Sequence, residues 1–145
     1  MKNIMGNLTT CLAAAILLSF GFVYVFRNSF MPYHSDAVSM PWTRVAPATR
    51  YLLLALMRAT AGGFISLAFA IIFLQYKFSM ERISWIPVLI LLLGTISMVC
   101  TSYATLILRF HTPGRPPFAD VVIGELLLIA GFIFNRKYLR KPHKS

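Results

Sequence analysis

The feature that most constrains this chain is a series of long apolar runs that contain almost no charged residues. Crossing the hydrocarbon core of a bilayer takes about 20 mostly apolar residues in a helix, and the first three runs reach that length. The fourth is shorter and carries two carboxylates, but prolines precede it and basic residues follow it, as at the ends of a membrane helix. We therefore predict four membrane-spanning helices, at residues 8–26, 51–76, 85–108 and 119–134.

Composition supports a membrane protein and excludes most soluble classes. Of the 145 residues, 58% are hydrophobic and only 12% are charged, whereas soluble domains carry about 25% charged residues. The formal net charge is +10, yet the basic residues flank apolar runs instead of covering a soluble face as in DNA-binding proteins. The sequence predicts one all-α membrane domain over residues 1–145, a four-helix transmembrane bundle with a longer outer loop between helices 1 and 2 and no nucleic-acid partner.

Basic residues also predict the orientation of the bundle. The side that holds both termini and the loop at 77–84 carries eight Lys and Arg residues, most of them in the basic tail 136–145, and the opposite side carries five. Because cytoplasmic loops are enriched in Lys and Arg, both termini are predicted to be cytoplasmic. The first run is interpreted as a retained anchor, since no small-residue cleavage site follows it.

Two ionisable residues fall inside the predicted spans. Charges in a span are costly and normally face the bundle interior or a cavity. Counting residues from the outer face places Arg58 and Glu125 at similar depths, so we predict that they form an ion pair between helices 2 and 4. The pair can be interpreted as a structural contact that fixes the order of the helices, or as part of a substrate or proton site. The sequence favours the structural contact.

Small and polar residues predict a pocket in the outer half of the bundle. The third run carries a stripe of Gly94, Ser97, Thr101 and Thr105, whereas the cytoplasmic half looks apolar. The second run carries a ridge of Gly62, Ser66 and Ala70, which we expect to pack against another helix. The predicted pocket and rim residues are Arg50, Tyr51, Ser66, Thr101, Ser102, Tyr103, Thr105, His34, His111, Arg115 and Asp120.

The loop between the first two spans has a composition that suits a cover for this pocket. Pro32 and Pro41 bracket a short interfacial turn or helix that we expect to lie over the outer mouth as a lid. Its His34, together with His111 and nearby methionines, lacks the tight spacing of metal ligands, so no metal or cofactor is predicted. Cys11 and Cys100 differ too much in depth for a disulfide, and both are predicted to be buried free thiols.

Several short stretches give the chain a family resemblance. They are Met31-Pro32-Tyr33-His34 with Trp42 before the second span, Tyr103-Ala104-Thr105-Leu106, and Thr112-Pro113 to Pro116-Pro117 before the fourth span. In length and layout the chain resembles small uncharacterised bacterial four-span proteins that are DoxX-like. The resemblance implies a four-helix bundle in the bacterial inner membrane and implies no activity.

Three functions remain open from sequence. The leading one is a non-enzymatic membrane protein whose outward polar pocket binds a small amphiphile, a lipid headgroup or an anion, with arginines supplying positive charge. An accessory subunit or assembly factor of a larger membrane complex, or a homo-oligomer, is the alternative. A proton-coupled transporter or membrane enzyme that uses Glu125 ranks third, because a carboxylate paired with arginine stays ionised.

Overall fold

A computed structural model describes residues 3–140, and this part of the chain is helical and contains no strand. Lys2 and residues 141–145 of the predicted basic tail lie outside the described residues. The all-α fold class is confirmed. The elements are α1 (Ile4–Phe26), α2 (Pro32–Val38), a short 3-10 helix (Trp42–Arg44), α3 (Pro47–Glu81), α4 (Ile86–His111) and α5 (Phe118–Leu139).

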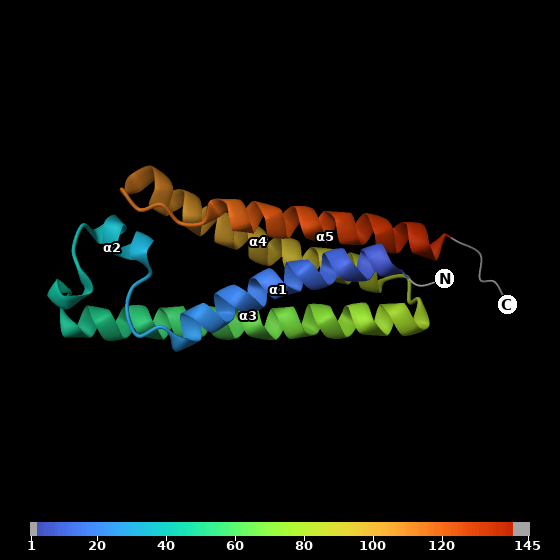
Figure 1. Cartoon of the computed structure of the whole chain (residues 1–145), viewed down its shortest axis with the longest axis horizontal. Coiled ribbons are helices and arrows are strands. Elements are labelled where there is room, and N and C mark those ends of the chain that lie inside the picture. The colour runs from blue at the N-terminus through green and yellow to red at the C-terminus, as the bar shows by residue number, and fades with distance from the viewer. Residues whose placement is uncertain (1–2, 141–145) are drawn as a thin grey trace.

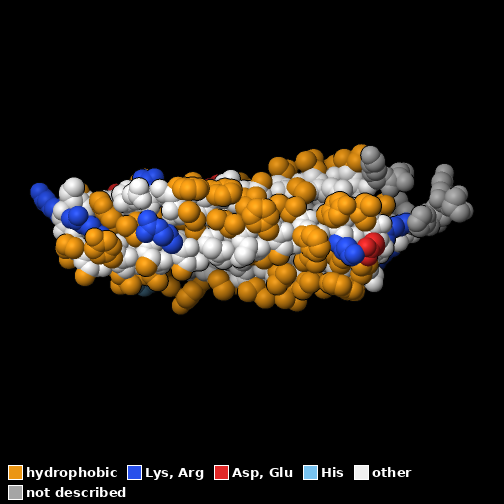
Figure 2. Space-filling view, turned by 90° about the horizontal axis from the view of Figure 1, so that it is seen from below, with side chains coloured by type: hydrophobic (Ala, Val, Ile, Leu, Met, Phe, Trp, Pro, Cys, Tyr) orange, Lys and Arg blue, Asp and Glu red, His pale blue; other side chains and the backbone are white. Residues whose placement is uncertain are grey.

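Four of these helices, α1, α3, α4 and α5, are long and apolar enough to cross a membrane. Their outward side chains are largely hydrophobic, and Figure 2 shows such side chains over the middle of one face, with Lys and Arg gathered toward the ends. Apolar surface on this scale would be strongly unfavourable in water. The protein is therefore a multi-pass membrane protein. Outward residues of this kind include Phe22, Phe69, Phe73, Leu92, Ile96, Val99 and Leu126.

Local sequence signals account for the helix ends. Prolines occupy the first turn of α2, α3 and α4, where a missing N–H costs nothing. The Asn3 side chain caps α1 by accepting a hydrogen bond from the Gly6 N–H at 3.3 Å. Arg82 ends α3 in the left-handed conformation. The prediction of a short helix after Pro32 is confirmed by α2.

The four long helices form a bundle in which α1 contacts α3 and α5, while α4 contacts α5 and, less extensively, α3. α3 and α5 therefore occupy opposite corners. Figure 1 shows that α3 and α4 lie close at the end where their short loop joins them and diverge toward the other end, where α2 fills the space between them. The bundle thus has a closed end and a splayed end covered by α2, which we call the lid end.

The closed end contains a buried polar network that the sequence analysis did not anticipate. Gln75 donates through Nε2 to Asn7 Oδ1 (2.7 Å) and to Asn135 Oδ1 (3.2 Å), and Asn135 Nδ2 donates back to Gln75 Oε1 (2.9 Å). Asn3 Nδ2 also donates to Asn135, and Ser79 to Asn7. The segments expected to be apolar in this half, Leu12–Leu18, Phe69–Leu74, Ile86–Leu93 and Leu126–Phe134, do contribute to the hydrophobic core, and the polar network lies just beyond them. We call this the amide end, because side-chain amides from α1, α3 and α5 are joined there.

Close packing extends from the amide end toward the middle of the bundle. A Cβ atom at Gly131 would lie 2.5 Å from Thr10 Oγ1, and one at Gly94 would collide with Leu128. A side chain at either position would therefore displace side chains of the neighbouring helix, which indicates close helix packing there.

Candidate functional site

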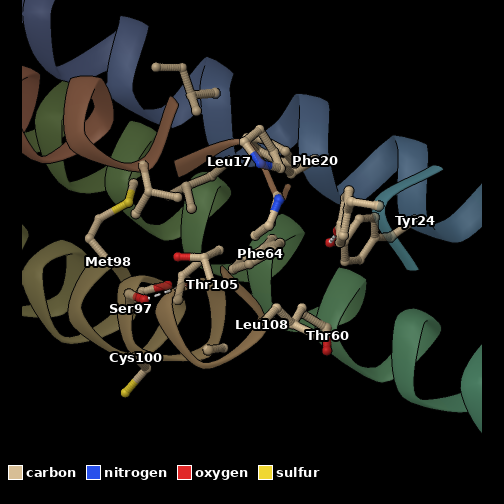
Figure 3. Close-up of a pocket in the computed structure, with 18 of the residues that line it drawn as sticks. Leu17, Phe20, Tyr24, Thr60, Phe64, Ser97, Met98, Cys100, Thr105 and Leu108 are labelled. Atoms are coloured by element: carbon tan, nitrogen blue, oxygen red, sulfur yellow. Dashed lines mark hydrogen bonds between the residues drawn. The ribbon is translucent and has the colours of Figure 1, made fainter. Parts of the chain in front are cut away.

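A cavity of about 550 Å³ lies inside the lid half of the bundle. Residues from all five α-helices line it, and Figure 3 shows Leu17 and Phe20 of α1, Phe64 of α3 and Met98 of α4 around it. Its volume is typical of small-molecule sites, which are mostly apolar with a few placed polar groups. The outer-half pocket expected from sequence is present, but its walls are mainly hydrophobic. The lining side chains with a polar atom are Tyr24, Tyr33, His34, Thr60, Ser97, Thr101 and Thr105, besides the thiol of Cys100.

The threonine hydroxyls in the wall already donate to the backbone of their own helices. Thr60 Oγ1 donates to the Leu56 carbonyl at 2.9 Å, and Thr101 Oγ1 donates to the Ser97 carbonyl at 2.8 Å. Such bonds to a preceding turn are how a helix satisfies a hydroxyl in an apolar setting. These groups retain acceptor lone pairs toward the cavity, but their donors are used.

His34 differs from the other polar groups of the wall. Its Nδ1 atom is buried and has no hydrogen-bond partner. Among residues 3–140, only one other buried side-chain nitrogen or oxygen atom lacks a partner, Glu125 Oε2. Burial, followed by the nearby guanidinium of Arg27, lowers the pKa of His34 below its ordinary value. The ring is therefore neutral at neutral pH. His34 Nδ1 is the one buried nitrogen or oxygen atom among the lining side chains that has no hydrogen-bond partner.

Tyr33 and Tyr24 form a hydrogen-bonded pair beside His34. Their hydroxyl groups bond to each other and join α2 to α1, and the rings of Tyr33 and His34 lie edge to face with centroids 4.4 Å apart. Burial, followed by the bond to Tyr24, raises the pKa of Tyr33, so its phenol stays un-ionised. Both tyrosines line the cavity, so α2 closes one end of it as the predicted lid.

Several contacts outside the cavity hold α2 in place. Arg27 Nε donates to the Phe30 carbonyl at 2.7 Å, and the Phe30 ring packs against Trp42 with centroids 4.7 Å apart. A Cβ atom at Gly114 would lie 2.6 Å from the Tyr33 carbonyl oxygen, so the loop between α4 and α5 rests directly on α2. Pro116 and Pro117 of that loop also line the cavity.

The predicted ion pair between Arg58 and Glu125 is wrong. Arg58 is exposed, and Glu125 Oε1 instead accepts a hydrogen bond from Thr95 Oγ1 at 2.8 Å. The bond between Gln75 and Asn135 sets the register of α3 against α5. Measured along each helix from this bond, Arg58 lies about 25 Å away on α3 and Glu125 about 15 Å away on α5, so the two residues are not at the same depth.

The length of α3 explains this error. The helix has 35 residues, or about 52 Å, well beyond a hydrocarbon core of about 30 Å. A helix of this length exceeds the hydrocarbon core, so a residue inside a span defined from sequence need not lie deep in it, and the long side chain of Arg58 can extend toward an interface. Sequence counting started the span at Tyr51 and so placed Arg58 too deep. α3 and α5 also occupy opposite corners, which keeps the two side chains apart.

Of the predicted pocket and rim residues, the structure brings His34, Thr101 and Thr105 to the cavity. Arg50 instead donates to the carbonyls of Thr43 and Val45, and its guanidinium lies 5.8 Å from the Trp42 ring centre, so it fastens the loop before α3. Asp120 borders a second, smaller hollow between α1 and α5. The predicted residues that line neither space are Tyr51, Ser66, Ser102, Tyr103, His111 and Arg115.

The predicted packing ridge on the second span is also wrong. Gly62, Ser66 and Ala70 are exposed, and the Ser66 hydroxyl donates to the Gly62 carbonyl of its own helix at 2.7 Å. Cys11 and Cys100 are free, as predicted, but exposed rather than buried. The 100° spacing placed Gly62, Ser66 and Ala70 on a common face correctly, but it could not show which face of the helix meets another helix.

Some lining residues escaped the sequence reasoning. Tyr24 and Tyr33 fit an aromatic belt at the membrane interface, and Phe64 and Thr60 carried no signal beyond hydrophobicity and helical spacing. One sequence signal pointed to Tyr33, its position between Pro32 and His34 in the predicted lid. The pairing with Tyr24 depends on how the chain turns between α1 and α2, which the sequence pattern does not reveal.

Comparisons with known proteins add no assignment to this site. No family model matches the chain, and neither the curated proteins nor the solved structures gave a match. The DoxX-like resemblance therefore stays a prediction. Within residues 3–140, no three His, Cys, Asp or Glu side chains gather in a way that could hold a metal ion.

Proposed function

We propose that this membrane protein binds a small amphiphile in the cavity of its lid half. The observation that carries the proposal is a cavity of about 550 Å³ whose walls are mainly apolar and include a few polar side chains, among them Tyr33, His34 and Ser97. Apolar walls favour a hydrocarbon chain through the hydrophobic effect. The few polar side chains in the wall favour a ligand that also has a polar head.

The charge of the wall supports an amphiphile over an anion. Arg50, Arg58 and Arg115, which the sequence suggested as sources of positive charge, do not line the cavity, and neither does any other Lys or Arg among residues 3–140. An anion moved from water into such a space would lose its hydration without a cationic partner, at a large cost in free energy. The anion alternative therefore has no support from the geometry.

Exposure of part of the wall indicates how an amphiphile would enter. Thr60 and Gly63 of α3, and Cys100 and Ala104 of α4, line the cavity and are also exposed. Gly63 lies about 18 Å along α3 from Gln75, a depth within a hydrocarbon core of about 30 Å. The opening between α3 and α4 therefore faces the bilayer, so a chain that already resides in the membrane can enter sideways.

Adjacent glycines in α3 offer a matched test. A Cβ atom at Gly62 or Gly63 would have no other atom within 4 Å, but only Gly63 lines the cavity. The probe is a 16-carbon alcohol that carries a photoreactive diazirine in its chain, added to the full-length protein in phosphatidylcholine nanodiscs. We expect labelling at Phe64 and Met98 in the wild type and in Gly62→Leu, and its loss in Gly63→Leu. Equal labelling of those residues in both variants would overturn the proposal.

The orientation and compartment belong to the same proposal. The excess of basic residues on the side of the amide end supports a cytoplasmic position for both termini, which puts the lid end outside, in a bacterial inner membrane. An accessory-subunit role and a proton-coupled role for Glu125 stay sequence-based predictions. If the protein is a subunit, it should co-purify with a larger membrane partner in mild detergent.

A further inference from the structure

We infer that Phe20, together with Ile16, determines which chains the cavity accepts. The two side chains form a partition between the cavity and the second hollow, which has a volume of about 420 Å³ and lies between α1 and α5. With the partition in place, the cavity favours an unbranched chain over a branched chain of the same size. The inference rests on the proposed function, because it names the class of chain that the same cavity takes.

The two spaces meet at these two side chains. Ile16 and Phe20 are the residues that line both the cavity and the second hollow. They are one helical turn apart on the same face of α1, and both are half-buried. Leu17, which lines the cavity alone, is buried, and Ser19, which lines the second hollow alone, is exposed.

The positions around α1 show the same order. At about 100° per residue, with Ala15 as the origin, the residues that line only the second hollow lie at about 0–80°. The shared pair lies at about 100–140°, and the residues that line only the cavity lie at about 180–200°. The first group consists of Leu12, Ala15, Ser19 and Val23, and the last of Leu17 and Tyr24. Ile16 and Phe20 therefore lie on the border between the two faces.

Helix α5 continues this border on the other side of the seam. Val121 lines the cavity and is buried, whereas Asp120 and Leu127 line the second hollow. Figure 1 shows that α1 and α5 diverge toward the lid end, so the two backbones do not close the seam there. The side chains of Ile16 and Phe20 are what separate the two spaces.

The shape of the cavity explains why the partition selects among chains. Its lining residues on α4 run from Ser97 to Leu108, about 16 Å along the helix, so the space is long and suits an extended chain. A branch needs room beside the chain, and on the α1 side that room begins behind Phe20. A branch in the opening between α3 and α4 would stay in the bilayer and gain no burial in the protein.

The test compares two isomeric alcohols, 1-hexadecanol and the branched 2-hexyl-1-decanol, as competitors of the photoreactive alcohol. Full-length protein in phosphatidylcholine nanodiscs is used, and the concentration of each isomer that halves the labelling of Phe64 and Met98 is measured. Hexadecanol should be the better competitor in the wild type. In Phe20→Ala the branched isomer should gain on hexadecanol by about fourfold for each methylene that enters the second hollow, which corresponds to about 0.8 kcal/mol.

Three further variants serve as controls. Phe22→Ala removes a ring of α1 that lines neither space and should keep the wild-type ratio. Ile16→Ala opens the other half of the partition, so it should change the ratio in the same direction, and it decides the test if Phe20→Ala does not fold. Ser19→Leu, added to Phe20→Ala, places a side chain in the second hollow and should remove the gain of the branched isomer.

The outcomes separate this inference from the proposed function. An unchanged ratio in Phe20→Ala and Ile16→Ala, an equal change in Phe22→Ala, or a gain that persists with Ser19→Leu would overturn the inference alone. If neither isomer reduces labelling of the wild type, or if Gly63→Leu leaves the labelling intact, the proposed function fails as well.

Discussion

The two ends of the bundle treat buried polar groups in opposite ways. At the amide end, Gln75 and Asn135 exchange hydrogen bonds with each other and with α1, so the buried amides have partners within the protein. At the lid end, His34 lines a cavity, and its buried Nδ1 atom has no partner. Both ends lie in an apolar environment in which an unmet hydrogen bond is costly.

The comparison separates polar residues that hold the fold from polar residues that line a cavity. In α1, α3 and α5, the amide network binds three helices together where they also pack closely, as at Gly131 against Thr10. In the splayed half the walls are open between α3 and α4, and α2 covers the space that the helices leave. Polarity alone does not identify a site, because both ends contain buried polar groups.

The largest effect should come from adding the same side chain to each end. Gly131→Leu would force a side chain into Thr10, and overpacking of this kind costs about 1–3 kcal/mol. Gly63→Leu enters open space and gains helix propensity, so its free energy of unfolding should change by less than about 1 kcal/mol. Unfolding in mixed micelles with increasing denaturing detergent measures both. Equal destabilisation would show that the two halves are packed alike.

A smaller effect should follow from opening the amide network. Gln75→Leu keeps the size of the side chain but leaves Asn135 Nδ2 without its partner, which should lower the free energy of unfolding by about 1–2 kcal/mol. Tyr76→Leu, at the adjacent position where the side chain is 62% exposed, is the matched control and should have little effect. A Gln75→Leu protein as stable as the control would remove the amide network from the account of stability.

The smallest effect should appear on mild acidification at the lid end. Burial and Arg27 lower the pKa of His34 in the folded protein, so the unfolded chain, with a histidine pKa of about 6.5, binds the proton first as pH falls. Stability is then independent of His34 well above pH 6.5 and decreases as pH falls through that value, by less than about 1.4 kcal/mol per pH unit.

Thermal unfolding between pH 7.5 and pH 5.5 checks this dependence. The midpoint should fall with pH in the wild type and in His111→Phe, and should fall less in His34→Phe. If His34→Phe shows the same decrease as His111→Phe, the buried state of His34 is not what links stability to pH.

Much of the fold could be predicted because apolar length and proline positions are local properties of the chain. The four apolar helices and the short helix after Pro32 followed from them. The candidate site was predicted in part, through His34, Thr101 and Thr105. Arg58 and Glu125 were paired wrongly because their depths were counted from assumed span ends, whereas α3 runs unbroken from Pro47 to Glu81.

The sequence by itself determined that this chain has four segments suited to a bilayer, because three apolar runs reach the length of a span and prolines and basic residues flank the shorter fourth. Only the tertiary structure decided which polar residues face one another. Helical spacing sets which residues share a face, but the direction of that face depends on neighbours distant in sequence. The pairing of Gln75 with Asn135, and the unpaired His34 beneath α2, are consequences of that packing.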